Sequence, residues 1–407
     1  MGDALARFIT PDQRRAALDG TRQLKMARST HAYVRGNTAN FYEWLAQSPV
    51  AAALPVGPAI WICGDCHLGN LGPVADSDAH VEIQIRDLDQ TVIGNPAHDI
   101  VRLALSLQTA VRGSDLPGVV SARMIEAVVD SYERAFLPRE SGEDDGPEPE
   151  SDTVRTVCKR ALGRSWKDLA RERIEDARPT IPLGKKYWPI DDVERGALHD
   201  LIHSPDVTRL ALTSFQTPDD SKVQIHDAAY WRKGCSSLGL LRYAVLIGVE
   251  TDKGAQTFGL IDVKEAVASV APAATGAKMP DQPAARVVTG ARALSPNLGD
   301  RMVAASLMDK SVIVRELLPQ DLKIEIEQFS GAEAIASARS LARVVGKAHA
   351  RQMDATTRAA WHQTLTASHS RTLDAPLWLW KAVVDLVAMH EAAYLEHCRI
   401  YALTEVA

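Results

Sequence analysis

The chain has 407 residues, of which 46% are apolar and 24% are charged, and its formal net charge is −6. These values are ordinary for a globular protein of one to three domains, and the negative balance argues against a general nucleic-acid binder. No apolar stretch reaches the roughly 20 residues that a membrane span needs, and the N-terminus lacks an apolar signal-peptide core. Because the five cysteines are few and odd in number, we expect reduced thiols and a cytoplasmic protein.

Residues 1–137 are predicted to form the first part of a helical lobe. Within them, residues 59–62 have the pattern of a short buried strand. Residues 81–86 alternate between apolar and polar side chains, which is typical of a strand with one buried face. The helices that we expect in this part span about residues 12–28, 38–45, 99–107 and 120–136.

The composition then changes at each of several boundaries. Residues 138–153 hold almost no apolar side chain and are predicted to be an acidic linker. Residues 154–220 are predicted to be a helical connecting segment, which begins with a basic helix over about 154–175. Residues 221–318 are β-rich, and residues 319–407 are predicted to be the helical remainder of the first lobe.

The β-rich part is predicted to contain two hairpins. Thr251-Asp252-Lys253-Gly254 is turn-like and separates two apolar runs, which is a hairpin pattern. The strands that we expect span 239–248, 257–264, 302–308 and 311–317, with Asp309-Lys310 joining the last two. The helices that we expect around and after them span about 284–294, 332–352, 354–368 and 375–404.

The densest group of oxygen ligands lies in residues 61–90. Asp65 and Asn70 stand five residues apart, and Asp87 with Asp89 follows the alternating strand. Carboxylates and a carboxamide are hard oxygen donors that suit Mg²⁺. A carboxylate is also the usual group that accepts a hydroxyl proton during phosphoryl transfer. This stretch is therefore a candidate phosphotransfer centre.

The same stretch resembles the catalytic and metal-binding loops of aminoglycoside-phosphotransferase-like kinases. Gly64-Asp65-Cys66-His67-Leu68-Gly69-Asn70 is similar to their catalytic loop, and Ile85-Arg86-Asp87-Leu88-Asp89 to their metal loop, with one extra residue after the Ile. The resemblance implies that Asp65 is the catalytic base and that Asn70 and Asp87 hold Mg²⁺. It also implies that Asp99 supports the loop from behind.

A rival pattern overlaps this loop. Cys63, Cys66 and His67 form C-x-x-C-H, the attachment pattern of c-type haem, and a C-x-x-C pair also occurs in zinc and dithiol sites. Haem attachment needs export, for which no signal is visible, and zinc needs further ligands. None of these alternatives explains Asn70 or Asp87. We therefore expect the two cysteines to be small buried residues.

A nucleotide site is predicted far downstream. The turn from Gly234 to Gly239 precedes one strand and Lys264 ends the next, which resembles the kinase glycine-rich loop and its strand Lys. The strand over 311–317 lies where a kinase chain crosses between lobes, so that its last backbone groups would meet adenine. The residues predicted to contact ATP are Gly234, Ser236, Ser237, Gly239, Lys264, Glu316 and Leu317.

Several positions depart from the kinase pattern or remain outside it. The predicted helix over 284–294 carries no acidic residue that could pair with Lys264, and Glu265 lies on the opposite face of the strand. His349 is expected to be a structural helix residue. Arg35 and Arg242 are expected on a solvated face rather than at a phosphate.

The predicted fold is α+β: a protein-kinase-like, two-lobed fold with a mainly helical large lobe. Because the catalytic loop precedes the nucleotide-binding strands, the kinase order is circularly permuted, which surface termini tolerate. The whole chain also resembles a widespread uncharacterised bacterial family. The resemblance to the kinase loops implies an ATP- and Mg²⁺-dependent phosphotransferase that acts on a hydroxyl of a small molecule, in preference to a protein, without nucleic-acid or membrane partners, and the similarity to the uncharacterised family supplies no settled substrate. The alternatives are a non-catalytic nucleotide binder and a nucleotidyl (AMP) transferase.

Overall fold

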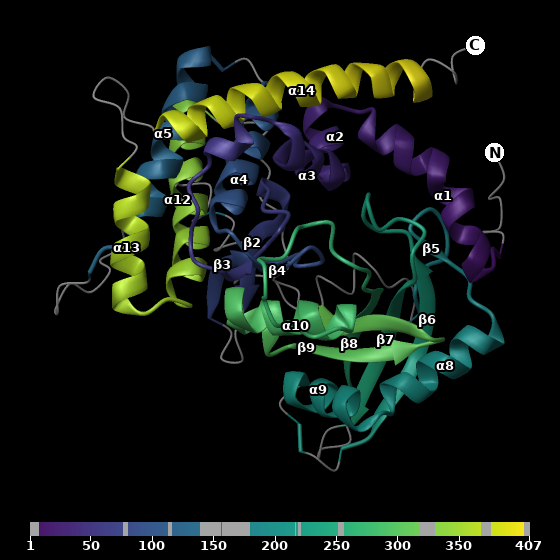
Figure 1. The fold of residues 1–407 in the computed structure, drawn as a ribbon. Helices are drawn as coiled ribbons and strands as arrows, with labels where there is room; N and C mark the ends of the chain where they lie inside the picture. The colour runs from purple at the N-terminus through teal and green to yellow at the C-terminus, as the bar shows by residue number, and fades with distance from the viewer. Residues whose placement is uncertain are drawn as a thin grey trace.

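The computed structural model describes most of the chain and is shown in Figure 1. The predicted acidic linker from residue 139 onward, nearly all of the predicted basic helix over 154–175 and the predicted turn at 251–254 lie outside the described residues. The described residues are 8–75, 80–112, 116–138, 156, 180–215, 217–218, 221–250, 256–317, 330–367 and 376–402.

Helices at both ends of the chain build one part of the molecule. In Figure 1, α5 and α12 lie at one side of the molecule, and α14 extends across the top from there toward α1. The N-terminal helices are α1 (Pro11–Met26), α2 (Thr30–Gly36), α3 (Thr38–Gln47), α4 (Ala97–Val111) and α5 (Gly118–Arg134). The C-terminal helices are α12 (Gly331–Ala350), α13 (Ala355–Thr366) and α14 (Leu377–Tyr401).

Short strands and 3₁₀ turns carry the loops between these helices. Two small antiparallel sheets form here, one from β1 and β4 and one from β2 and β3. The elements are η1 (Ala51–Ala53), β1 (Ile60–Ile62), η2 (Leu68–Asn70), β2 (Leu71–Ala75), β3 (Val81–Ile85) and β4 (Val92–Gly94).

An antiparallel six-stranded sheet in the order β5-β6-β7-β8-β10-β9 forms the second part. Its strands are β5 (Tyr187–Trp188), β6 (Val223–Trp231), β7 (Arg242–Glu250), β8 (Gln256–Glu265), β9 (Met302–Leu307) and β10 (Lys310–Leu317). Its helices are α8 (Asp192–Ile202), α9 (Pro205–Phe215), α10 (Pro283–Leu294) and α11 (Pro296–Gly299). This mixture of helices and antiparallel strands agrees with the expected α+β class.

The two faces of the sheet differ because side chains alternate along each strand. On one face, apolar residues such as Val245 and Ile261 join a core with residues of α8 and α9. On the other face, Leu246, Leu260 and Leu317 belong to a separate apolar cluster. The alternation places Asp262 and Lys264 on this second face, which therefore changes from apolar to charged along β8.

Helix α1 joins the sheet to the rest of the molecule. The Arg14 guanidinium and the Glu194 carboxylate are both buried, with Nη1–Oε1 and Nη2–Oε2 distances of 2.5 and 2.9 Å. Glu194 also accepts the N–H of Asp191, which completes a capping box at α8. At the other end of α1, His397 Nε2 of α14 lies 2.9 Å from the Gln23 carbonyl oxygen. Helix α1 was predicted as part of the first lobe, but it contacts both parts.

Most predicted elements are confirmed, with shifted boundaries. The predicted helix 12–28 ends at Met26, because Ser29 accepts the N–H of Ala32 and starts α2 as a separate helix. Strand β7 starts at Arg242 rather than residue 239, since Gly239 has a positive φ of 95° within the turn. Met308 and Asp309 both have positive φ and make the β9–β10 turn, one residue earlier than predicted. No helix among the described residues has the length and apolar character to cross a membrane.

Candidate functional site

The predicted catalytic loop follows β1 and is anchored by backbone geometry at Gly64. Gly64 has a φ of 74° and lies so close to the metal loop that a Cβ here would be 2.1 Å from the Gln90 carbonyl oxygen. Any side chain at this position would therefore displace the backbone. The glycine immediately before Asp65 is thus a steric requirement of the packing between the two loops.

Asp99, near the start of α4, holds this loop from behind. Its carboxylate accepts the backbone N–H groups of Cys63 at 2.7 Å and Gly64 at 3.0 Å. His349 Nε2 lies 3.1 Å from the same carboxylate, and its Nδ1 lies 2.9 Å from the Tyr132 hydroxyl. Since a carboxylate only accepts, Nε2 carries the hydrogen and Nδ1 accepts from Tyr132. The support role expected of Asp99 is confirmed, and His349 is structural as predicted.

Asp65 is held at both carboxylate oxygens and opens to solvent on one side. Arg102 Nε donates to Oδ1 at 2.9 Å, and Thr38 Oγ1 donates to Oδ2 at 2.8 Å. The Asp65 side chain is 13% exposed. Burial raises the pKa of Asp65 above its usual value, although the Arg102 charge opposes this. Asp65 is therefore a positioned carboxylate of increased basicity.

Asn70 and Asp87 lie at the same end of the β2–β3 hairpin. The backbone N–H of Arg86 donates to the Asn70 carbonyl at 2.7 Å, which continues the ladder that pairs Leu71 with Ile85. The Asn70 amide donates to the Asp65 carbonyl oxygen at 2.9 Å. Asp87 stands two residues after the end of β3, and its side chain is 46% exposed. The two predicted Mg²⁺ ligands are therefore brought together beside the catalytic loop.

The acidic partners of Lys264 are the metal-loop carboxylates themselves. Lys264 Nζ lies 3.3 Å from Asp87 Oδ1 and makes a close ion pair with Asp89 Oδ2. Helix α10 supplies Arg286 instead of an acid, and its guanidinium donates to the Asp89 carbonyl oxygen at 2.8 Å. The partner that the sequence did not identify thus comes from the loop after β3.

These ion pairs separate the pKa values of the two carboxyls. Burial by itself would raise the pKa of Asp87, but the charges of Lys264, Arg315 and Arg242 outweigh it and hold that pKa well below the usual range. Burial and the neighbouring Asp87 charge raise the pKa of Asp89 to about 6, against the opposing Lys264. Asp87 therefore stays ionised to lower pH than Asp89 does.

Arg242, Asp262 and Arg315 form a second charged group beside Lys264 on the sheet. Arg242 binds Asp262 through two hydrogen bonds of 3.0 and 2.7 Å, and Arg315 Nη2 donates to the same carboxylate at 3.1 Å. Burial alone would raise the pKa of Asp262, but the charges of Arg242 and Arg315 hold it well below the usual range. Arg242 is 5% exposed, so the expectation that it lies on a solvated face was wrong.

We expect Asp262 to stabilise the protein in a pH-dependent way. Because its folded pKa is depressed, its contribution is complete above the unfolded pKa of about 4 and is lost as the pH falls below it. Asp262→Asn should lower the free energy of unfolding by about 3–5 kcal/mol at pH 7, since the buried Arg242 and the partly buried Arg315 lose this partner. Urea unfolding between pH 7 and 3 should show this difference shrinking below about pH 4. A difference that is constant over this range would contradict the assignment.

A cavity of about 460 Å³ opens in front of Asp65. Its lining includes Asn70 and three of the predicted nucleotide contacts, Gly234, Ser236 and Ser237. It also includes three carboxylates, those of Asp65, Asp87 and Asp89. The cationic side chains of the lining are Lys25, Arg28, Arg35, Arg232, Lys233 and Arg242. The cavity is therefore suited to a polyanionic ligand.

The remaining predicted nucleotide contacts are not in this lining. Gly239 packs against α1, where a Cβ would be 2.6 Å from the Cα of Arg15, so its glycine is needed for helix packing and not for a phosphate. Lys264 lies behind Asp87 and Asp89, beside a separate small cavity. Glu316 and Leu317 are 2% and 3% exposed on β10. These are the two residues whose backbone was expected to meet adenine, and the chain directly after them is outside the described residues.

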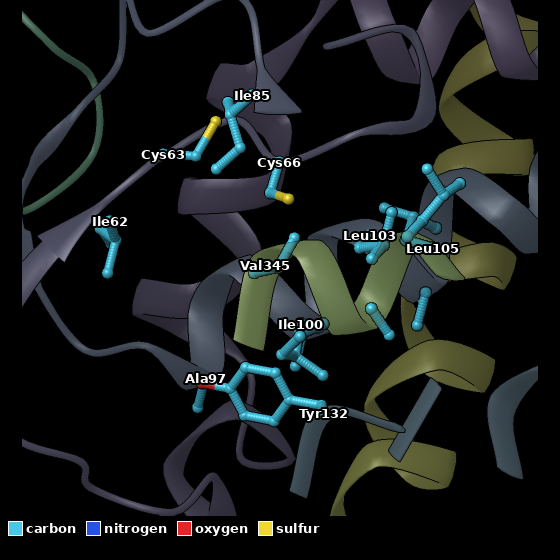
Figure 2. Packing of buried hydrophobic residues seen from close by; sticks show 14 of the residues in the cluster. Ile62, Cys63, Cys66, Ile85, Ala97, Ile100, Leu103, Leu105, Tyr132 and Val345 are labelled. Carbon is cyan, nitrogen blue, oxygen red and sulfur yellow. The ribbon is translucent and has the colours of Figure 1, made fainter. Parts of the chain in front are cut away.

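The cysteines of the rival haem pattern are buried beneath the loop. Cys63 and Cys66 are 0% and 1% exposed and lie in the apolar core with Ile85 and Val345 (Figure 2). A hydrogen bond to Cys66 and burial raise the pKa of the Cys63 thiol well above its usual value. Such thiols are unreactive. The expectation of buried cysteines is confirmed.

In the part of the chain that the structure describes, no three His, Cys, Asp or Glu residues are arranged to hold a metal ion.

The cations of α1, α2 and the β6–β7 turn were not predicted as site residues. Lys25 and Arg28 come from the end of α1 and the loop after it, and Arg35 from α2. Arg35 was expected on a solvated face, but its Nε is buried and the residue lines the cavity. Local sequence offers no signal for these positions, because only tertiary packing brings α1 and α2 to the turn.

The match to a family model covers residues 14–400, and its description is "Uncharacterized protein conserved in bacteria (DUF2252)". The chain belongs to this family. No curated protein and no solved structure matches the chain.

This assignment corrects the resemblance to aminoglycoside-phosphotransferase-like kinases. The family that covers almost the whole chain is an uncharacterised bacterial one, and no kinase family is found. The Gly64–Asn70 loop and the Asp87 loop are short patterns, and short patterns recur in unrelated families. Function must therefore be argued from the geometry of the site.

Proposed function

We propose that this protein is an ATP- and Mg²⁺-dependent phosphotransferase that acts on a hydroxyl group of a small molecule. The observation that carries the proposal is the convergence of Asp65, Asn70 and Asp87 at one cationic cavity, with Lys264 paired to Asp87 behind it. Three segments contribute them: the loop after β1, the loop after β3 and, far downstream in the sequence, the end of β8. A positioned base, hard oxygen ligands and a Lys beside them are the groups that phosphoryl transfer uses.

The residues fit Mg²⁺ without a closed cage of protein ligands. Asp87 is ionised and about half exposed, and Asn70 adds a carboxamide at the same hairpin end. Mg²⁺ usually binds one or two carboxylates and completes its shell with water and phosphate oxygens. Bound there, the metal would neutralise charge on the phosphates. Lys264 is paired with Asp87 and Asp89, and with nucleotide bound it would pair with a phosphate instead.

The protein's own part in the reaction is proton transfer and positioning. Asp65 accepts the proton of the substrate hydroxyl as that oxygen forms a bond to the γ-phosphorus of ATP. The bond from the γ-phosphorus to the bridging oxygen breaks, and ADP leaves with the electron pair. Arg102 and Thr38 keep the Asp65 carboxylate oriented during this step. The cavity volume of about 460 Å³ lies within the usual range for small-molecule sites.

The arrangement of elements supports a two-lobed, kinase-like and circularly permuted architecture as part of the proposal. A turn with two glycines joins β6 to β7, the Lys stands on the next strand, β8, and a helix, α10, follows it. Protein kinases place a glycine-rich loop, a third-strand Lys and a helix in this order. The proposed large lobe then has residues from both ends of the chain, α3 to α5 and α12 to α14.

The test is incubation of the protein with ATP, Mg²⁺ and a metabolite mixture, followed by mass spectrometry of the products. A phosphorylated metabolite together with ADP is the expected result. An added AMP would replace the proposal by nucleotidyl transfer. Nucleotide binding without any product would replace it by a non-catalytic nucleotide binder, and absence of nucleotide binding would exclude all three.

Asp87→Asn is expected to weaken Mg-nucleotide binding. Removal of the charged ligand should raise the Kd for Mg-ATP by roughly tenfold to a hundredfold, on the scale of 1.5–3 kcal/mol for a contact with a charged group. Calorimetric titration with and without Mg²⁺ measures this effect. Asp130→Asn, at an exposed position of α5, is the control and should bind as the wild type does. Equal Mg²⁺ dependence in wild type and Asp87→Asn would contradict the ligand role.

A further inference from the structure

The six cationic side chains that line the cavity differ in whether they already have a partner within the protein. Arg242 is committed to Asp262, and Lys25 Nζ donates to the Gly234 carbonyl oxygen at 3.0 Å. Arg232 stacks on Trp188, and Lys233 on Trp231, at 4.5 and 4.1 Å from the ring centroids. Four of the six are thus held by described residues.

Arg28 and Arg35 are different. No hydrogen bond or ion pair joins either guanidinium to another described residue, although both line the cavity. Arg28 is exposed at its mouth, whereas Arg35 is half-buried and its Nε has no partner. Burial lowers the pKa of Arg35, which the charges of Asp65 and Asp87 only partly offset. A partly buried cation without a close partner has lost part of its hydration, so an anion bound at Arg35 would be favoured.

Arg35 contacts the loop that carries Asp65. Its guanidinium lies flat against Gly69, where a Cβ would be 2.5 Å from Nη2 and 2.6 Å from Cζ. Gly69 precedes Asn70 and lies four residues after Asp65. A glycine at this point lets the guanidinium reach the loop that holds the base. An anion on Arg35 would therefore lie next to the reacting hydroxyl.

The nucleotide does not account for this pair. Its phosphates are expected at the Gly234–Ser237 turn, at Asp87 and at Lys264, which supply a cation and a metal site. Arg28 follows α1, and Arg35 lies in the last turn of α2, where its guanidinium contacts Gly69 of the loop that carries Asp65. Their charges also make the cavity unfavourable for a polycationic acceptor such as an aminosugar, because like charges repel.

We propose that Arg28 and Arg35 bind a phosphate group on the acceptor, so that the substrate is a phosphorylated small molecule with a free hydroxyl. This inference rests on the proposed phosphotransferase function and names its substrate class. A planar guanidinium binds phosphate through paired hydrogen bonds. The bound phosphate remains on the acceptor and takes no part in the bond changes. The cationic pair thereby orients the hydroxyl toward Asp65.

The test uses protein saturated with Mg²⁺ and a non-hydrolysable ATP analogue, titrated with glycerol 3-phosphate or with glycerol. We expect glycerol 3-phosphate to bind and glycerol to bind at least about tenfold more weakly, as a lost charge-assisted contact implies. Arg28→Gln and Arg35→Gln should each weaken glycerol 3-phosphate about tenfold on the same scale and leave affinity for the analogue unchanged. Arg134→Gln, on the exposed surface of α5, is the control and should change neither.

Three results would overturn the subsite. These are equal binding of glycerol and glycerol 3-phosphate, no binding of glycerol 3-phosphate, and loss of analogue binding in the two Arg variants, which would assign these cations to the nucleotide. Failure of the proposed function looks different: the analogue does not bind, while glycerol 3-phosphate still binds and depends on Arg28 and Arg35. Because Arg28 is exposed, its variant keeps the test valid even if Arg35→Gln does not fold.

Discussion

In the Asp65→Asn variant we expect nucleotide binding to persist and turnover to fall by about 10²–10⁴-fold, the usual contribution of a general base. The carboxamide keeps its oxygen toward Arg102 and donates its N–H to the Thr38 hydroxyl, so the loop retains its contacts. It lacks the basicity to accept a hydroxyl proton. Release of ADP in the presence of the acceptor mixture measures turnover, and calorimetry measures binding of Mg-ATP.

Two further measurements make this result specific. The unfolding midpoint of Asp65→Asn should stay close to that of the wild type, which separates loss of the base from loss of the fold. Thr38→Ala removes only an orienting hydrogen bond, worth about 0.5–1.5 kcal/mol, so it should slow turnover by roughly tenfold or less. Wild-type turnover in Asp65→Asn would rule out Asp65 as the base.

The second large effect is on stability, in the Asp99→Ala variant. The change leaves the buried N–H groups of Cys63 and Gly64 and the imidazole of His349 without an acceptor. We expect the free energy of unfolding to fall by about 3–5 kcal/mol, as when one partner of a buried charged network is removed. Urea unfolding at neutral pH measures it.

The control for this variant is Asp130→Ala, which removes an exposed carboxylate paired with Arg134 on α5. Its free energy of unfolding should change by less than about 0.5 kcal/mol. Asp99→Ala should also reduce turnover, because the loop that carries Asp65 loses its anchor. An unfolding free energy within about 1 kcal/mol of the wild type would show that the loop is held in another way.

Much of the fold was predictable because its signals are local. Apolar spacing marked α4, α5 and the C-terminal helices, and alternation marked β3. The errors lie at element ends, such as Met308 and Asp309, where positive φ values make the β9–β10 turn. The structure brings Asp65, Asn70 and Asp87 together, as predicted, because a short hairpin separates them in sequence.

The contacts between distant segments were not predictable. Nothing near Lys264 in sequence indicates that its partners lie about 175 residues earlier, at Asp87 and Asp89. Likewise, Gly239 lies in a turn that was predicted to bind phosphate, but in the structure it packs against helix α1. Such pairings depend on how the sheet packs against the helices, which local spacing does not encode.

The sequence by itself predicted the Gly64–Asn70 loop, the Asp87 loop beside it and the supporting Asp99, since each is set by residue type and short spacing. Only the tertiary structure decided which acids pair with Lys264 and which cations face the cavity. The physical reason is that α1 and α2 pack against both parts of the molecule and carry Arg28 and Arg35 to the loop of Asp65. The charge of that cavity, and with it the proposed substrate class, follows from the packing.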